Sequence, residues 1–217
     1  MRFPHAHSGV KKLFICELIG IIATTLAVVG AILAAIGLKK NALLLTGGSL
    51  LLASGIALVV VFILQLVGLH QAGKDELQIK YAFCLVIIGV VLSLIASILS
   101  ALSSHPVLVT IGKYFAIAVD VATVIALEYT LSGIATLAGK LGNEKMRKMG
   151  EGLALAVLIL FIVSIVLSLY ATILNANVKD WVKITVSVAS VLAALAELVV
   201  SLLTLVYYGK STKMLKE

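Results

Sequence analysis

Charged residues are scarce in this chain, and so is proline. Only 12% of the 217 residues are Asp, Glu, Lys or Arg, and the two prolines stand at positions 4 and 106. Hydrophobic residues make up 62% of the chain, and the mean hydropathy is +1.20. A single water-soluble core of this size could not hide so much apolar surface. These values exclude a soluble globular protein and leave few signals that would interrupt a helix.

Motifs that carry enzyme chemistry are also missing. The chain has no H-E-x-x-H, no G-x-S-x-G and no P-loop, and none of its four histidines lies inside an apolar stretch. His5 and His7 could bind a metal only with ligands from elsewhere, and two histidines in a tail are more simply soluble polar residues. Cys16 and Cys84 are best interpreted as small packing residues. We therefore predict no enzyme, no cofactor and no metal site.

What the chain does contain is six long apolar stretches. Each matches or exceeds the roughly 20 residues that a helix needs to cross a bilayer. They are Leu13 to Leu38, Ala42 to Leu69, Tyr81 to Leu102, Val107 to Gly139, Gly152 to Asn175 and Lys183 to Tyr208. Such runs are too long and too uniformly apolar for barrel strands. The sequence predicts an all-α, polytopic membrane protein: a six-helix transmembrane domain at 13–208 between cytoplasmic tails at 1–12 and 209–217.

The orientation follows from the basic residues, which resist translocation when they lie near the ends of a span. An even number of spans places both termini on one side, together with twelve of the Lys and Arg residues. That side carries Arg2, Lys11, Lys12, Lys74, Lys80, Lys140, Lys145, Arg147, Lys148, Lys210, Lys213 and Lys216. The opposite side carries Lys39, Lys40, Lys113, Lys179 and Lys183. We expect a cell-membrane protein with both termini in the cytoplasm.

The net charge of +7 is then explained by the bilayer. Basic residues at the cytoplasmic face are attracted to anionic lipid headgroups. They are spread over short segments without a long basic block or a binding module, so we expect no nucleic-acid partner. The predicted outer loops are very short. Segments His70 to Lys80 and Lys140 to Glu151 are therefore the surfaces for a soluble partner, unless they are only solvated connectors.

A short sequence repeat suggests that the six spans form three similar hairpins. The nine residues from Val91 to Leu99 return, with two changes, from Val166 to Leu174. The alternative is chance, because Leu, Ile, Val, Ala and Ser alone can generate such matches. Small residues also line several spans. In the first span Gly20, Thr24, Ala27, Ala31 and Ala35 share a face with Glu17, and in the second Gly47 and Ser54 align with Gln65.

The candidate site residues are the ionisable and amide side chains that these spans would bury. They are Glu17, Gln65, Lys113, Asp120, Glu128 and Glu197. An Asp at the centre of a membrane helix costs at least about 2.5 kcal/mol on insertion scales, so each should face the helix bundle or water. At 100° per residue, Lys113, Asp120 and Glu128 share one narrow face of the fourth span with Thr110. Glu197 lies on a polar stripe that runs along the sixth span from Lys183 to Tyr208.

Each candidate also has a structural interpretation. Glu17 is near enough to the cytoplasmic surface to reach it or to pair locally, and Lys113 could extend to the outer headgroups. Protonated carboxyls of Asp120, Glu128 and Glu197 could serve only to join helices through hydrogen bonds. Gln65 is most simply an interhelix hydrogen-bond donor or acceptor.

Two functions fit these features. The first is a small transporter or channel for protons, cations or a small cationic or amphipathic solute that passes the intramembrane carboxyls. The second is a membrane scaffold or accessory subunit that transports nothing and uses its polar faces for packing, within a homo-oligomer or against a membrane partner subunit. A wet cavity between the fourth and sixth spans would favour transport, and tight closure by Ser and Ala would favour the scaffold.

Overall fold

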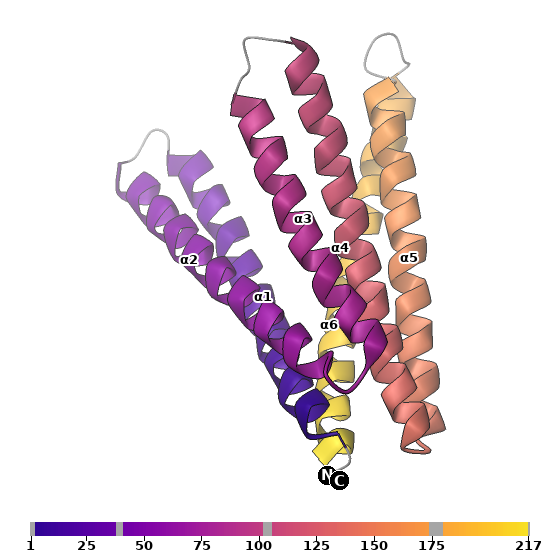
Figure 1. Ribbon diagram of the computed structural model, residues 1–217. Coiled ribbons are helices and arrows are strands. Elements are labelled where there is room, and N and C mark those ends of the chain that lie inside the picture. Colours follow the sequence, from indigo (N-terminus) through magenta and orange to yellow (C-terminus); the bar gives the residue numbers. More distant parts are fainter. Residues whose placement is uncertain (1–2, 38–40, 102–105, 174–179, 217) are drawn as a thin grey trace. The chain divides into compact units, whose positions relative to one another are not determined.

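The structure is a computed structural model that describes residues 3–37, 41–101, 106–173 and 180–216. Within these residues the chain is all-helical, as the sequence predicts, and it forms six helices (Figure 1). The helices are α1 (Pro4–Ile36), α2 (Asn41–Ala72), α3 (Leu77–Ala101), α4 (Pro106–Lys140), α5 (Glu144–Ile173) and α6 (Asp180–Lys216). Each is long and apolar enough to cross a membrane. The chain is therefore a multi-pass helical membrane protein.

Several helices continue past the spans that the sequence predicts. α1 already begins at Pro4, where a proline at the first helical position costs no hydrogen bond. α6 continues to Lys216, through the segment predicted as a C-terminal tail. The predicted connectors at 70–80 and 140–151 shrink to the residues between Ala72 and Leu77 and between Lys140 and Glu144. Little chain therefore remains outside helices at these two turns.

The α4–α5 turn closes through a glycine in the left-handed region. Gly142 has φ +74°, and the Asn143 N–H donates to the Ala138 carbonyl at 2.9 Å, which is the Schellman pattern for ending a helix. Asn143 then caps α5, because its Oδ1 accepts from the Met146 N–H at 3.1 Å. The turn residues thus satisfy the backbone groups that the two helix ends would leave unpaired.

The chain divides into two compact units. Unit 1 comprises Met1–Asp75 and Tyr208–Glu217, and unit 2 comprises Glu76–Tyr207. The chain passes between the units at the α2–α3 turn and again inside α6, which is continuous through Tyr207 and Tyr208. The helix packing is therefore described for each unit separately.

Unit 1 is built on a seam of small residues between the antiparallel helices α1 and α2. Residues 9, 16, 23 and 30 of α1 are all buried, and they are Gly, Cys, Ala and Gly. The α2 positions that face three of them, at 47, 61 and 68, are also separated by multiples of seven, and Ser54 between them is buried. Gly9 meets Gly68, the Cys16 Sγ donates to the Val61 carbonyl at 3.3 Å, and Gly30 meets Gly47. A repeat of seven keeps one stripe of each helix against the other, and small side chains bring the backbones close.

Unit 2 packs α4 against both α3 and α5. Gly133 of α4 lies against Ile79 of α3, and the Cβ of Ala135 lies near Gly150 of α5. Tyr207 of α6 is fully buried and its ring lies over Gly150. Thr136 Oγ1 adds a polar link, because it donates to the Gln78 Oε1 at 3.2 Å. The core of this unit therefore lies toward the α4–α5 turn.

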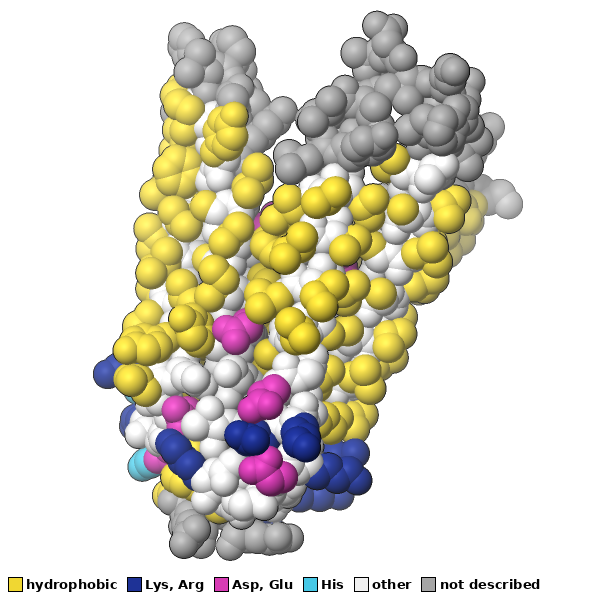
Figure 2. Space-filling model, turned by 90° about the vertical axis from the view of Figure 1, so that its right-hand side faces the viewer, with side chains coloured by type: hydrophobic (Ala, Val, Ile, Leu, Met, Phe, Trp, Pro, Cys, Tyr) yellow, Lys and Arg dark blue, Asp and Glu magenta, His cyan; other side chains and the backbone are white. Residues whose placement is uncertain are grey.

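Most of the apolar surface of the helices is not covered by protein. In the most apolar window of each span, only 6% to 22% of the residues are buried. Hydrophobic side chains cover the helices along most of their length in Figure 2. Ile56, Leu45 and Leu52 of α2, for example, are each more than two-thirds exposed. In a bilayer these side chains would lie against lipid.

Candidate functional site

Two of the three α4 candidates have side chains that the structure describes. Because α4 is continuous from Pro106 to Lys140, the spacing expected from the sequence is kept. Asp120 is exposed and Glu128 is half-buried. Neither forms a hydrogen bond or ion pair with another described side chain. Lys113 lies in the same helix, but its side chain is outside the described residues. A carboxyl group without a protein partner in a span needs water, a cation or a further chain.

Glu197 has a partner on the neighbouring helix. The Ser164 hydroxyl of α5 donates to Glu197 Oε1 of α6 at 2.7 Å. The Glu197 side chain is otherwise exposed, so its carboxyl is held by one interhelix bond and remains accessible. A hydroxyl donor stabilises a carboxylate in a setting that offers few other donors. Among the described residues, this bond is the one polar link between α5 and α6 that involves a candidate residue.

The face of α6 that carries Glu197 becomes more buried toward the α4–α5 turn of unit 2. Glu197 is exposed, Ser201 is half-buried, Thr204 is 2% exposed and Tyr207 is 0% exposed. Thr204 Oγ1 has no hydrogen-bond partner among the described residues. A buried hydroxyl without a partner is rare in folded proteins and asks for an explanation.

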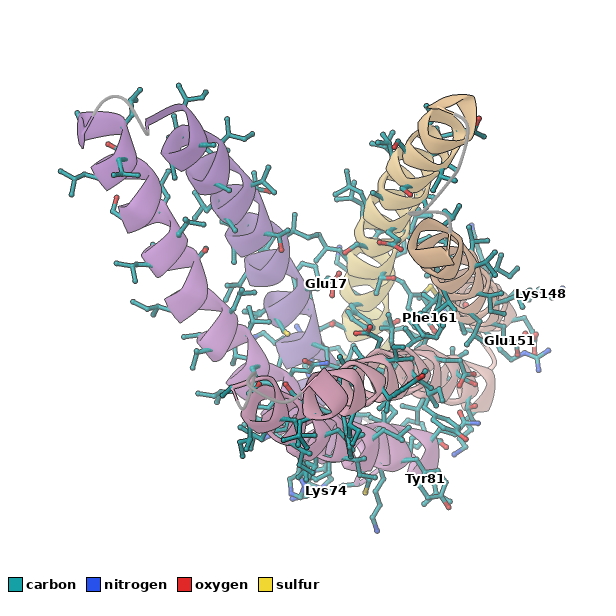
Figure 3. All side chains as sticks on the ribbon, turned by 90° about the horizontal axis from the view of Figure 1, so that it is seen from above. Glu17, Lys74, Tyr81, Lys148, Glu151 and Phe161 are labelled. Atoms are coloured by element: carbon teal, nitrogen blue, oxygen red, sulfur yellow. The ribbon has the colours of Figure 1, made fainter. Side chains whose placement is uncertain are left out.

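Glu17 and Gln65 lie in unit 1 and do not form a pair with each other. Glu17 follows Cys16, which faces α2, and in Figure 3 the Glu17 side chain points away from α2. Both Glu17 and Gln65 are half-buried. The Lys12 Nζ donates to Gln71 Oε1 at 2.7 Å and to Ser8 Oγ at 3.1 Å. The stripe of small residues that starts at Gly20 of α1 does not pack against α2. A Cβ added at Gly20 would have no atom within 4 Å.

Two consecutive carboxylates of the α2–α3 turn, Asp75 and Glu76, bind the ends of other helices. The Ala6 N–H in the first turn of α1 donates to Asp75 Oδ2 at 2.7 Å, within unit 1. In unit 2, the Lys140 Nζ at the end of α4 donates to Glu76 Oε2 at 2.6 Å. An acid near a helix N-terminus and a base near a helix C-terminus both complement the helix dipole. The sequence interpretation of 70–80 as a solvated connector is wrong for Glu76, whose side chain is only 7% exposed.

Charged groups outside the spans collect around the α4–α5 turn of unit 2. Arg147 Nε donates to Glu144 Oε2 at 3.0 Å and lies 3.9 Å from Glu151 Oε1. Figure 3 shows Lys148 and Glu151 on the outer side of α5. Among the described residues, no group of three or more His, Cys, Asp or Glu side chains is placed to hold a metal ion.

Sequence reasoning missed the roles of Ser164, Thr204, Asp75 and Glu76. Ser164 and Thr204 do belong to small and polar stripes, but the stripes alone do not say which hydroxyl meets a carboxyl. No family model, curated protein or solved structure matches the chain.

Proposed function

We propose that this protein is a small membrane transporter or channel for a proton, a cation or a small cationic solute. The observation that carries the proposal is the Ser164–Glu197 bond, which holds a carboxyl at the edge of α5 and α6 without covering it. An accessible carboxyl inside a membrane span is a suitable site for a proton or another cation to bind and leave.

The α4 carboxyls support the same function. Asp120 and Glu128 belong to unit 2, as Glu197 does, and they have no ion-pair partner among the described residues. If these groups were only structural, we would expect each to be closed off by donors from a neighbouring helix. We propose that they bind the same cation or proton at other points along its path.

A membrane scaffold is the second candidate, and one observation favours it. The spans are little buried, so most of their surface is open to lipid or to another membrane chain. A second copy or a partner subunit could cover Asp120 and Glu197 and satisfy them there. This proposal differs from transport in one measurable respect: the purified protein alone would carry no flux.

We also propose that the protein lies in the cell membrane with both termini in the cytoplasm. The bases that support this orientation include Lys140, Lys145, Arg147 and Lys148, which all lie close to the α4–α5 turn. Lys39, Lys40 and Lys179 on the opposite side lie outside the described residues, and so do the side chains of Lys113 and Lys183. The difference in the number of basic residues between the two sides of the membrane therefore comes from the sequence alone.

The deciding experiment is flux in liposomes that contain only the purified protein. Proton flux would be read with an enclosed pH-sensitive dye, and flux of Na⁺ and K⁺ with ion-sensitive dyes. Wild type would be compared with Asp120→Asn, Glu128→Gln and Glu197→Gln. Glu144→Gln is the matched control, because this carboxyl is exposed at the first turn of α5. Flux lowered by the span variants but not by Glu144→Gln would support transport. Absence of any flux, with every variant folded, would favour the scaffold.

A further inference from the structure

We infer that the species carried is a proton, relayed along one face of α6 from Glu197 through Ser201 and Thr204 to Tyr207; this rests on the transport function proposed above. All four side chains belong to unit 2 and can exchange a proton through a carboxyl or hydroxyl oxygen. Relative to Glu197, they lie within a sector of about 120° at 100° per residue. Their side chains become steadily less exposed along the helix.

Thr204 is the residue that distinguishes this face from an ordinary polar helix surface, because its buried hydroxyl has no hydrogen-bond partner among the described residues. The described threonines at positions 24, 25, 46, 123, 130, 136 and 212 each donate to the carbonyl four residues earlier in their own helix. Thr204 forms no such bond, although it is almost fully buried. Burial without a partner costs free energy that a valine of the same shape would not. The hydroxyl is therefore available to exchange protons with a neighbour.

The spacing along α6 suits a relay through single waters. Glu197 and Ser201 are separated by about 6 Å along the axis, and Ser201 and Thr204 by about 4.5 Å, at 1.5 Å per residue. A gap of this size can be bridged by one water molecule that is bonded on both sides. Ser164 orients the Glu197 carboxyl at the exposed end through its 2.7 Å bond.

The buried end of the face excludes larger species. The Tyr207 ring lies so close to Gly150 that a Cβ added at Gly150 would collide with the Tyr207 hydroxyl. The same added Cβ would lie 2.9 Å from the Ala135 Cβ. A hydrated Na⁺ or K⁺ ion or an organic cation could not pass there without moving the helices apart. A proton needs only an oxygen that can accept and release it.

The transfer itself requires no other reactant. The Glu197 carboxylate takes up a proton at its exposed side and becomes a carboxylic acid. It then gives this proton to the next oxygen of the chain, while each hydroxyl or water that receives a proton releases the one it held. At the end the Tyr207 hydroxyl has given its own proton to a water molecule and kept the one that it received, and Glu197 is a carboxylate again. No bond between heavy atoms forms or breaks.

The test is Thr204→Val in the liposome assay, with proton flux and Na⁺ and K⁺ flux measured on the same preparation. We expect proton flux to fall roughly tenfold or more, as losses of a proton-transfer group do, with no loss of thermal stability. Thr204→Ser should restore the flux, since it returns the hydroxyl. Thr130→Val is the matched control, because Thr130 is buried in α4 of the same unit and bonded to the Ala126 carbonyl.

The outcomes separate this inference from the function on which it rests. Wild-type protein that carries no flux of any ion would overturn the transport function and the relay together. Flux of Na⁺ or K⁺, or proton flux that Thr204→Val leaves unchanged, would keep the transport function and overturn the relay. Equal losses in Thr204→Val and Thr130→Val would also overturn it, since they would report a general effect on packing.

Discussion

The Lys140 Nζ lies 2.6 Å from the Glu76 Oε2, and the two partners differ sharply in exposure. The Glu76 side chain is 7% exposed, whereas the Lys140 side chain is 49% exposed. This pair joins the start of α3 to the end of α4. Because of this difference, a variant that removes the lysine leaves a buried carboxylate, whereas a variant that removes the carboxylate leaves a half-exposed ammonium group.

We expect Lys140→Met to destabilise the protein more than Glu76→Gln. Removal of the lysine leaves a buried carboxylate without its donor, which costs about 1–3 kcal/mol. Removal of the charge on Glu76 leaves a half-exposed ammonium that water can solvate, so the loss should be about 1 kcal/mol or less. Thermal unfolding in detergent, followed by circular dichroism, measures the order. Equal losses, or a larger loss for Glu76→Gln, would contradict the burial asymmetry.

Gly150 and Gly152 of α5 provide a matched pair for the packing of unit 2. A methyl group at Gly150 would collide with the Tyr207 hydroxyl and lie 2.9 Å from the Ala135 Cβ, while one at Gly152 would meet nothing within 4 Å. We expect Gly150→Ala to destabilise by about 1–3 kcal/mol. Gly152→Ala should stabilise by up to about 1 kcal/mol, because alanine favours helix.

The same unfolding measurement decides this prediction, and a double variant sharpens it. Tyr207→Phe removes the oxygen nearest to the new methyl group, so it should restore part of the stability lost in Gly150→Ala. If Gly150→Ala and Gly152→Ala behaved alike, Tyr207 would not be packed on α5 as described.

Asp75 should stabilise the first turn of α1 as a cap contributed from another part of the chain. Its Oδ2 accepts from the Ala6 N–H across 69 positions of sequence. Asp75→Ala should cost about 1 kcal/mol, and Asp75→Asn less, because the amide oxygen can still accept. Hydrogen exchange is the suitable readout, with faster exchange expected in residues 5–9 and little change at the start of α5. Uniform acceleration in both helices would contradict a local cap.

The expected orientation can be checked by labelling a single exposed cysteine. In a Cys84→Ala background the remaining Cys16 is buried, so Lys145→Cys provides a reactive thiol at the exposed start of α5. A membrane-impermeant maleimide should label it only after the cells are permeabilised. Lys40→Cys, on the predicted outer side, should react in intact cells. The reverse pattern would place the termini outside.

The length and hydrophobicity of the six stretches were enough to predict the fold class, because a bilayer leaves a long apolar run few alternatives to a helix. Which face packs was harder to predict. Small residues are so common that the Gly20 stripe of α1 looks as suitable as the seam through Gly9 and Gly30. Only the repeat of seven, shared by α1 and α2, distinguishes the real interface. The sequence contains that signal, but it is meaningful only once the two helices are aligned antiparallel.

The candidate site was predictable in part for a different reason. The cost of burying charge in a membrane points to Asp120, Glu128 and Glu197 from their positions alone. Their partners depend on how the helices are rotated, and periodicity within one helix does not determine this rotation. Ser164 is one of two serines in α5, and only the packed structure brings its hydroxyl to Glu197. For the same reason Asp75 and Glu76 resemble ordinary connector residues in the sequence.

Two glycines of α1 differ in how closely they approach other residues, and one of them belongs to the seam of unit 1. A Cβ added at Gly9 would lie 2.5 Å from the Gly68 carbonyl oxygen and 2.6 Å from the Ala72 nitrogen, while one at Gly20 would have no neighbour within 4 Å. Backbone atoms cannot rotate away as a side chain can, so the helices would have to separate. We expect Gly9→Ala to destabilise by about 1–3 kcal/mol and Gly20→Ala to be neutral or slightly stabilising.

Disulfide trapping can show whether the seam itself changes, since unfolding alone does not locate the damage. Cys16 faces Val61 in the seam, so in a Cys84→Ala background Val61→Cys should form a disulfide with Cys16 under mild oxidation. Gly9→Ala should slow this cross-link, because it pushes the helices apart two turns away, and Gly20→Ala should not. An unchanged rate in Gly9→Ala, or equal slowing in both variants, would mean that Gly9 does not hold α1 against α2.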